Sequence, residues 1–259
     1  MTTSQGPQTH LPVLRLVTLA YADVWRAFRA MPILFGCAVL IILAFRVAEE
    51  WLRPWNDRGL AVVALRNIAE NAAQYFCLTP IMIAIHRFII RGDVMRGYLV
   101  DLKDPSFLPF FGWAMMISIA MTLVFTFYEL LLTIGQGPLA AFVPFAAGLI
   151  AIIYCWLRLI VLFPALAVSA AGAKPANAFA DTQGFGLRLL AIVVLTFIPL
   201  MILVVLTTLA LGRRMVAFTP MFVLSDALGA VLSTITTVAL VVVASHIYLA
   251  LGRKLRSAA

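Results

Sequence analysis

The side chains with the clearest chemical potential in this sequence are ionisable groups set inside or beside long apolar segments. Arg158 interrupts one apolar segment, Arg66 and Glu70 lie in the first half of another, and Glu129 and His246 lie near the ends of two more. Inside a bilayer such groups are costly, so they mark internal ion pairs or a functional site. We therefore treat these five residues as a candidate intramembrane polar or binding site.

Arg158 poses the sharpest question because its guanidinium is charged at any relevant pH. It continues a stripe of small residues spaced by four and three, namely Gly137, Ala141, Pro144, Gly148, Ala151 and Cys155. Small residues favour close helix packing, so the arginine is expected to face into the bundle. It is either a structural lock or snorkelling group, or a binding site for a substrate or lipid headgroup. Candidate partners are carbonyls freed by Pro80 or Pro164, the side chain of Asp181, and lipid phosphate.

No arrangement of residues in the sequence predicts catalysis. The histidines at 10, 86 and 246 are far apart, and none belongs to the His-Glu-x-x-His pattern of a zinc protease. The sequence also lacks a Gly-rich phosphate loop with its lysine and a G-x-S-x-G turn. Cys37, Cys77 and Cys155 all lie in apolar segments without metal-ligand spacing. We expect no enzyme activity, no cofactor and no metal site.

The composition places these residues in a membrane protein. Of 259 residues, 64% are hydrophobic and 12% are charged, and the mean hydropathy is +1.05, which excludes an ordinary soluble domain. About 20 residues cross the hydrocarbon layer as a helix. We predict an all-α polytopic bundle in one domain, residues 13–252, between a disordered segment 1–12 and a basic tail 253–259. Its six predicted spans are 31–48, 60–90, 107–133, 139–169, 189–211 and 222–251.

An amphipathic helix is predicted before the first span, over residues 14–29. Its apolar side chains oppose Arg15, Arg26 and Arg29, and Tyr21 and Trp25 suit the level of lipid headgroups. This pattern is typical of a helix that lies in the membrane interface. The stretch before the first span does not match a signal peptide, so we expect the first span to remain as an anchor.

The second span begins with polar residues at offsets of three and four, which places them on one arc of the helix. They are Arg66, Asn67, Glu70, Asn71 and Gln74. Arg66 and Glu70 can pair along the helix, so the arc is either a self-neutralised, water-facing extension or the wall of a polar cavity. Glu129, near the end of the third span, either reaches the interface or has a buried functional role.

The positive charges are distributed unequally between the two sides of the predicted bundle. The formal net charge is +8, and twelve Lys and Arg residues lie on the side of both termini, against six on the other side. The positive-inside rule then places both termini in the cytoplasm; the bacterial inner membrane is the location that the resemblance described below implies. The basic residues lie at the ends of spans instead of forming one patch, so we expect no nucleic-acid partner.

Two stretches resemble a known membrane domain. Arg158-Leu-Ile-Val-Leu-Phe-Pro-Ala-Leu-Ala167, followed by Ala178-Phe-Ala-Asp-Thr-Gln-Gly184 and Arg188-Leu-Leu190, is similar to the six-span domain of some bacterial glycerophosphodiester phosphodiesterases and related inner-membrane proteins. The segment from Pro80 to Gly92 resembles the related proteins. Phe179 stands where such linkers often carry tryptophan. In the enzymes the chemistry belongs to a separate soluble barrel, so the resemblance implies the architecture and no catalytic residue.

Together these patterns predict a non-catalytic scaffold or accessory subunit that contacts membrane lipids and a partner membrane protein. The alternative is a transport component that binds an anionic solute or a lipid headgroup near Arg158. In that alternative, prolines break the helices around a midplane site lined by Arg158, Glu70 and Glu129.

Overall fold

The structure is a computed structural model that describes residues 12–52, 59–211 and 219–257. Within these ranges it consists of helices and contains no strand. The helices are α1 (Val13–Ala30), α2 (Pro32–Leu52), α3 (Leu60–Arg91), α4 (Phe107–Thr133), α5 (Pro138–Leu159), α6 (Leu162–Ala167), α7 (Pro175–Asp181), α8 (Gly186–Leu211), α9 (Pro220–Leu251) and α10 (Arg253–Arg256). Six of them, α2 to α5, α8 and α9, are long and apolar enough to cross a membrane. The predicted all-α polytopic bundle is confirmed; the predicted disordered segment lies, apart from Pro12, outside the described residues.

Glycine and proline set several of the helix ends. α3 ends at Gly92, whose φ of 78° is left-handed backbone that favours glycine. Gly135, at φ 81°, turns the chain between α4 and α5. Pro138 and Pro220 begin α5 and α9, where a missing N–H costs no helical hydrogen bond. These local rules account for the end of α3, the turn between α4 and α5, and the start of α9.

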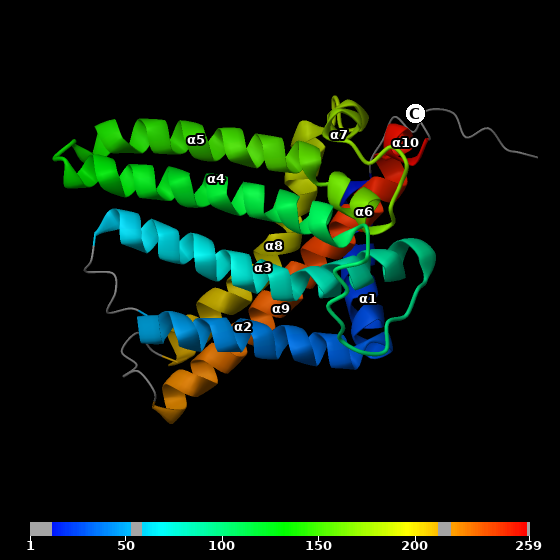
Figure 1. Ribbon diagram of the computed structural model, residues 1–259, viewed down its shortest axis with the longest axis horizontal. Helices are drawn as coiled ribbons and strands as arrows, with labels where there is room; N and C mark the ends of the chain where they lie inside the picture. The colour runs from blue at the N-terminus through cyan, green and yellow to red at the C-terminus, as the bar shows by residue number, and fades with distance from the viewer. Residues whose placement is uncertain (1–11, 53–58, 212–218, 258–259) are drawn as a thin grey trace, which may run out of the picture.

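The helices pack closely at one end of the bundle and diverge toward the other. We call the end where α4 joins α5 the distal end, and the opposite end, where α1, α6, α7 and α10 lie, the terminal end (Figure 1). α3 packs extensively against α4 and α9, and α2 packs against α9. α8 and α9 cross the bundle diagonally and move away from α4 and α5 toward the distal end (Figure 1). The buried residues of α3 all lie between Leu78 and Phe88, in its terminal half.

The fourth predicted span, 139–169, is a shorter helix followed by a separate turn of helix. α5 ends at Leu159, the chain turns at Ile160 and Val161, and α6 follows. Pro164 has no N–H to donate to the carbonyl of Ile160, so a continuous helix would lose that bond. The prediction of one span to residue 169 is therefore wrong, and Arg158 lies in the last turn of α5 instead of deep within a helix.

The predicted amphipathic helix is present as α1 and crosses the terminal end of the bundle (Figure 1). One face is buried against α8 and α9 and includes Asp23, whereas Leu14, Trp25 and Phe28 are exposed. The Oδ2 atom of Asp23 lies 2.9 Å from Nε2 of His246, and the Tyr21 hydroxyl donates to the Thr196 carbonyl at 2.6 Å. Both contacts fasten α1 to the bundle, so His246 has a positioning role.

Candidate functional site

A polar cavity of about 820 Å³ opens between α2, α3, α4 and α9 in the distal half of the bundle. It contains two of the five residues singled out in the sequence, Glu70 and Glu129. Its other polar lining residues are Arg46, Glu49, Asn67, Asn71, Gln74, Tyr75, Ser118, Thr122, Thr126, Ser233, Thr236 and Thr237. We call this space the distal cavity.

The arc of polar residues on α3 forms one wall of the distal cavity. Asn67, Glu70, Asn71 and Gln74 line it because offsets of three and four share one face of a helix. Arg66 lies beside this wall, with its Nε 3.4 Å from Oε1 of Glu70. The two interpretations of the arc are therefore both partly realised, since the ion pair forms along α3 and the remaining polar groups face a cavity.

The distal cavity carries an excess of negative charge. Its lining holds one guanidinium, Arg46, and three carboxylates, Glu49, Glu70 and Glu129. Arg46 pairs with Asp226 at 3.5 Å, and Glu70 pairs with Arg66, so these four charges cancel. Among the described residues, Glu49 and Glu129 remain, both with exposed side chains, which gives this lining a formal surplus of two negative charges and makes it unfavourable for anions.

Several polar groups of the distal cavity are free to bind a ligand or water. Thr122 and Thr236 donate to carbonyls of their own helices, at 3.0 and 2.8 Å. In contrast, the described residues supply no hydrogen-bond partner to the side chains of Asn71, Gln74 or Glu129. Polar groups at membrane depth need a partner, so groups like these are tolerated where they line a space that water or a ligand can enter.

The distal cavity is bounded unevenly. α4 and α9 line it from opposite sides but make little direct contact with each other. α5 contributes no lining residue, and α8 contributes Phe197. The space is lined mainly by α2, α3, α4 and α9.

Arg158 lies elsewhere, at the terminal end, where it lines a second cavity. Its Nη1 donates to the Thr182 carbonyl, and the Thr182 hydroxyl lies 3.3 Å from the Arg158 carbonyl. The guanidinium also lies over the rings of Tyr154 and Phe179, at 5.7 and 5.8 Å. The structure therefore does not assemble a midplane site from Arg158, Glu70 and Glu129; the break after Leu159 brings Arg158 to the α7–α8 linker.

The small-residue stripe that leads to Arg158 packs along only part of its length. Ala141 is fully buried, and a Cβ at Gly148 would lie 3.1 Å from a methyl group of Val124 on α4. Ala151 and Cys155, closer to Arg158, are exposed. Gly137 and Pro144 are exposed as well, so the stripe packs closely at Ala141 and Gly148 and leaves its other members on an open surface.

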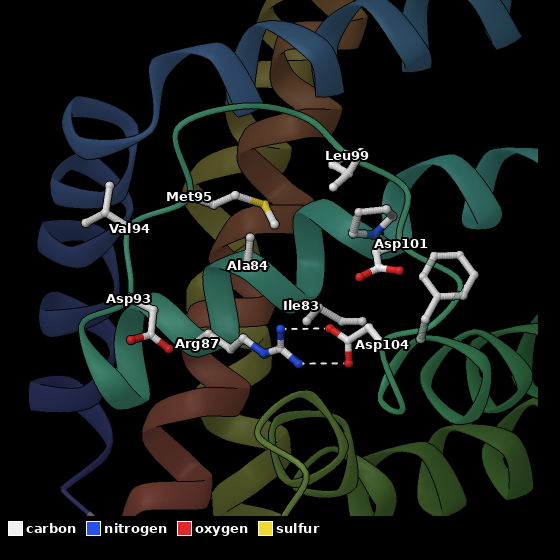
Figure 2. Close-up of a pocket in the computed structure, with 11 residues that line it drawn as sticks. Ile83, Ala84, Arg87, Asp93, Val94, Met95, Leu99, Asp101 and Asp104 are labelled. Atoms are coloured by element: carbon white, nitrogen blue, oxygen red, sulfur yellow. Dashed lines mark hydrogen bonds and ion pairs between the residues drawn. The ribbon is translucent and has the colours of Figure 1, made fainter.

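A different polar cluster, which the sequence did not reveal, joins α3 to α6 and the loop before α4 at the terminal end. We call it the Arg87 junction. Nη1 of Arg87 lies 2.8 Å from Oδ2 of Asp104, Nη2 donates to Oδ1 of Asp104 at 3.0 Å, and Nε donates to the Ala167 carbonyl at 2.7 Å (Figure 2). Nη2 also donates to the Ser106 hydroxyl at 3.1 Å. The adjacent cavity is only about 270 Å³.

The charges of the Arg87 junction satisfy each other. Burial alone would raise the pKa of Asp104, but hydrogen bonds from Arg87 and from the Ser106 backbone outweigh it and hold that pKa below its usual value. The one available sequence signal was Asp104-Pro-Ser106 directly before a helix, which is a helix-start pattern. It predicts a cap, and the arginine partner 17 residues earlier cannot be read from it.

Comparison of this chain with protein-family models, with curated proteins and with solved structures gave no match in any of the three. The resemblance to the membrane domain of glycerophosphodiester phosphodiesterases stays a prediction. The functional argument consequently rests on the residues and the geometry described above.

Proposed function

We propose that this chain is a non-catalytic membrane protein that binds an organic cation, rich in hydrogen-bond donors, in the distal cavity, and that it acts as a transport component. The observation that carries the proposal is the polar face of α3, which turns unpartnered amides toward a cavity with two surplus carboxylates. Ionisable groups that face a cavity inside a membrane bundle are expected to mark a substrate or ion pathway.

The chemistry of the lining supports an amine over an anion. Carboxylates accept hydrogen bonds and attract positive charge, and the amide and hydroxyl groups of the walls can bind further N–H donors. Among the described residues of the distal cavity, Arg46 and Arg66 are both paired with carboxylates. This pairing favours an amine over an anion as the ligand of the distal cavity, and the anionic-solute hypothesis belongs to the region of Arg158.

We infer that the protein lies in a bacterial inner membrane with both termini in the cytoplasm. The excess of Lys and Arg on the side of the termini supports this orientation. Arg158 adds to the excess, since it lies at the terminal end beside the α7–α8 linker. In this orientation the distal cavity belongs to the half of the bundle that faces away from the cytoplasm.

Calorimetric titration of the purified full chain tests the proposal, with spermidine and ethanolamine as cations and glutarate as the anion. We expect an amine to bind and glutarate not to bind. Glu129→Gln removes a surplus carboxylate and should weaken amine binding about fivefold or more, the equivalent of roughly 1 kcal/mol. Asp93→Asn, at the terminal end, is the matched control and should bind normally. Absence of amine binding, or equal binding by Glu129→Gln, would reject the proposal.

A scaffold or accessory subunit is the second candidate, and the exposed part of the small-residue stripe favours it. Ala151 and Cys155 lie on an exposed face of α5, where a helix of a partner membrane protein can approach closely. Cysteine-directed crosslinking at Cys155 in native membranes should then capture one protein in stoichiometric yield. A Cys155→Ser control must lose the product, and capture of lipid alone would reject this role.

A further inference from the structure

We propose that the cavity at the terminal end binds the phosphate group of an anionic ligand, in a site formed by Arg158, Arg188 and Arg253. This cavity of about 960 Å³ lies between the end of α5, the α7–α8 linker and the junction of α9 with α10. The three arginines come from segments far apart in the sequence and line one space. The inference is independent of the distal cavity and of the function proposed for it.

Arg158 is held in place before any ligand arrives. Its Nη1 is fixed by the Thr182 carbonyl, and the rings of Tyr154 and Phe179 flank its guanidinium. Its Nε is buried and has no hydrogen-bond partner in the described part of the chain. Nη2 makes no hydrogen bond to the described residues, so the guanidinium is held through Nη1 and keeps its Nη2 donor for an oxyanion.

The other two arginines lie at the mouth of the cavity. The Arg188 guanidinium lies 5.8 Å from the ring centroid of Phe185, which orients it in the first turn of α8. Arg253 is exposed at the start of α10. Arg188 lies at the beginning of α8 and Arg253 directly follows the end of α9, which is the level at which lipid headgroups lie.

The single carboxylate in the lining does not neutralise this cluster. Oδ1 of Asp181 accepts the backbone N–H of Lys254 at 3.1 Å, and Oδ2 accepts that of Leu255 at 3.0 Å. Asp181 therefore caps the first turn of α10 and holds Arg253 beside the cavity. Among the described residues, the lining thus combines three guanidiniums with one carboxylate that is engaged by backbone N–H groups, a composition that favours an anion.

The phosphate can belong to an anionic lipid or to a soluble phosphate compound, and two arms of one experiment separate these sources. In the first arm the full chain, in neutral detergent, is titrated with phosphatidylglycerol and phosphatidylcholine and followed by native mass spectrometry. We expect preferential binding of phosphatidylglycerol, weakened about fivefold by each of Arg158→Gln and Arg253→Gln. Arg96→Gln, an exposed arginine at the same end, is the control and should bind normally.

In the second arm, pyrophosphate is added to the lipid-free chain and thermal unfolding is recorded. A higher melting temperature with the parent chain and Arg96→Gln, but not with Arg253→Gln, assigns the site to a soluble phosphate compound. Arg253 is exposed, so its variant keeps the test valid even where Arg158→Gln does not fold. Binding of both probes that is unchanged by Arg253→Gln would overturn the proposal, and the basic cluster would then serve only to orient the chain in the membrane.

Discussion

The distal cavity and the Arg87 junction contain the same kinds of residue but use them in opposite ways. At the junction, Arg87 makes contacts to Asp104, Ser106 and the Ala167 carbonyl. In the distal cavity, the described residues leave Asn71, Gln74 and Glu129 without such partners. Paired polar groups at membrane depth hold helices together, and unpaired groups that line a cavity are available to a ligand.

The contrast has an energetic basis. Removing one member of a half-buried, hydrogen-bonded ion pair such as Arg87–Asp104 leaves the other charge without its partner and costs about 1–3 kcal/mol. A polar group in an open cavity loses no protein partner when it is replaced, so the same change costs little. Stability and binding should therefore respond to different residues, and variants in the two regions can separate them.

The largest effect on stability is expected for Arg87→Gln. The variant takes the guanidinium away from the half-buried Asp104 carboxylate and also removes the hydrogen bond to the Ala167 carbonyl, at a cost of about 2 kcal/mol. Thermal unfolding in detergent measures the loss, with Arg96→Gln as the control on the same side. Equal melting temperatures for the two variants would show that the junction does not hold the terminal end together.

A smaller effect should appear in the dependence of stability on pH. The pKa of Asp104 is lower in the folded chain than in the unfolded chain. The ionised carboxylate therefore adds to the free energy of unfolding above the unfolded pKa of about 3.9, and this stabilisation is lost as the pH falls through the folded-state pKa. The gap in melting temperature between the parent and Asp104→Asn should be constant near neutral pH and close below about pH 4. A gap that persists in acid would contradict the ion-pair explanation.

Asp23→Asn should have a more modest effect, because it weakens the contact with His246 but keeps a hydrogen-bonding side chain. We expect a loss of about 1 kcal/mol together with faster proteolysis of α1, since this contact fastens α1 to α9. Arg15→Gln, on the exposed face of α1, provides the reference. Identical proteolysis of the two variants would show that α1 is held by its other contacts.

The smallest effect on stability is expected for Glu129→Gln, less than about 0.5 kcal/mol. Its side chain has no partner among the described residues, so the fold loses nothing when the charge is removed. Amine binding, measured by calorimetry on the same preparation, should nevertheless fall. A large drop in melting temperature would mean that Glu129 belongs with the structural polar groups.

Local rules made most of the architecture predictable. Hydropathy over about 20 residues locates the spans, and Gly92, Gly135 and Pro138 mark helix ends by their backbone chemistry. The break after Leu159 was missed because apolar residues continue on both sides of it, and the effect of Pro164 on the preceding turn was underestimated. Apolar composition alone cannot distinguish one long helix from two short ones.

The candidate site was predictable only where its residues share one helix. The arc on α3 follows from spacing, whereas its facing Thr126, Glu129 and Ser233 come from helices whose relative rotation no local pattern sets. The partner of Arg158 was likewise hidden. It is the carbonyl of Thr182, a backbone group that carries no signal in the sequence.

The most direct test of the central claim combines thermal unfolding with amine titration for one double variant, Asn71→Leu with Gln74→Leu. Both side chains line the distal cavity. The account predicts a melting temperature equal to or above that of the parent chain and a loss of spermidine binding. A double variant that unfolds as early as Arg87→Gln and still binds spermidine would show that the polar face of α3 supports the fold and not a ligand.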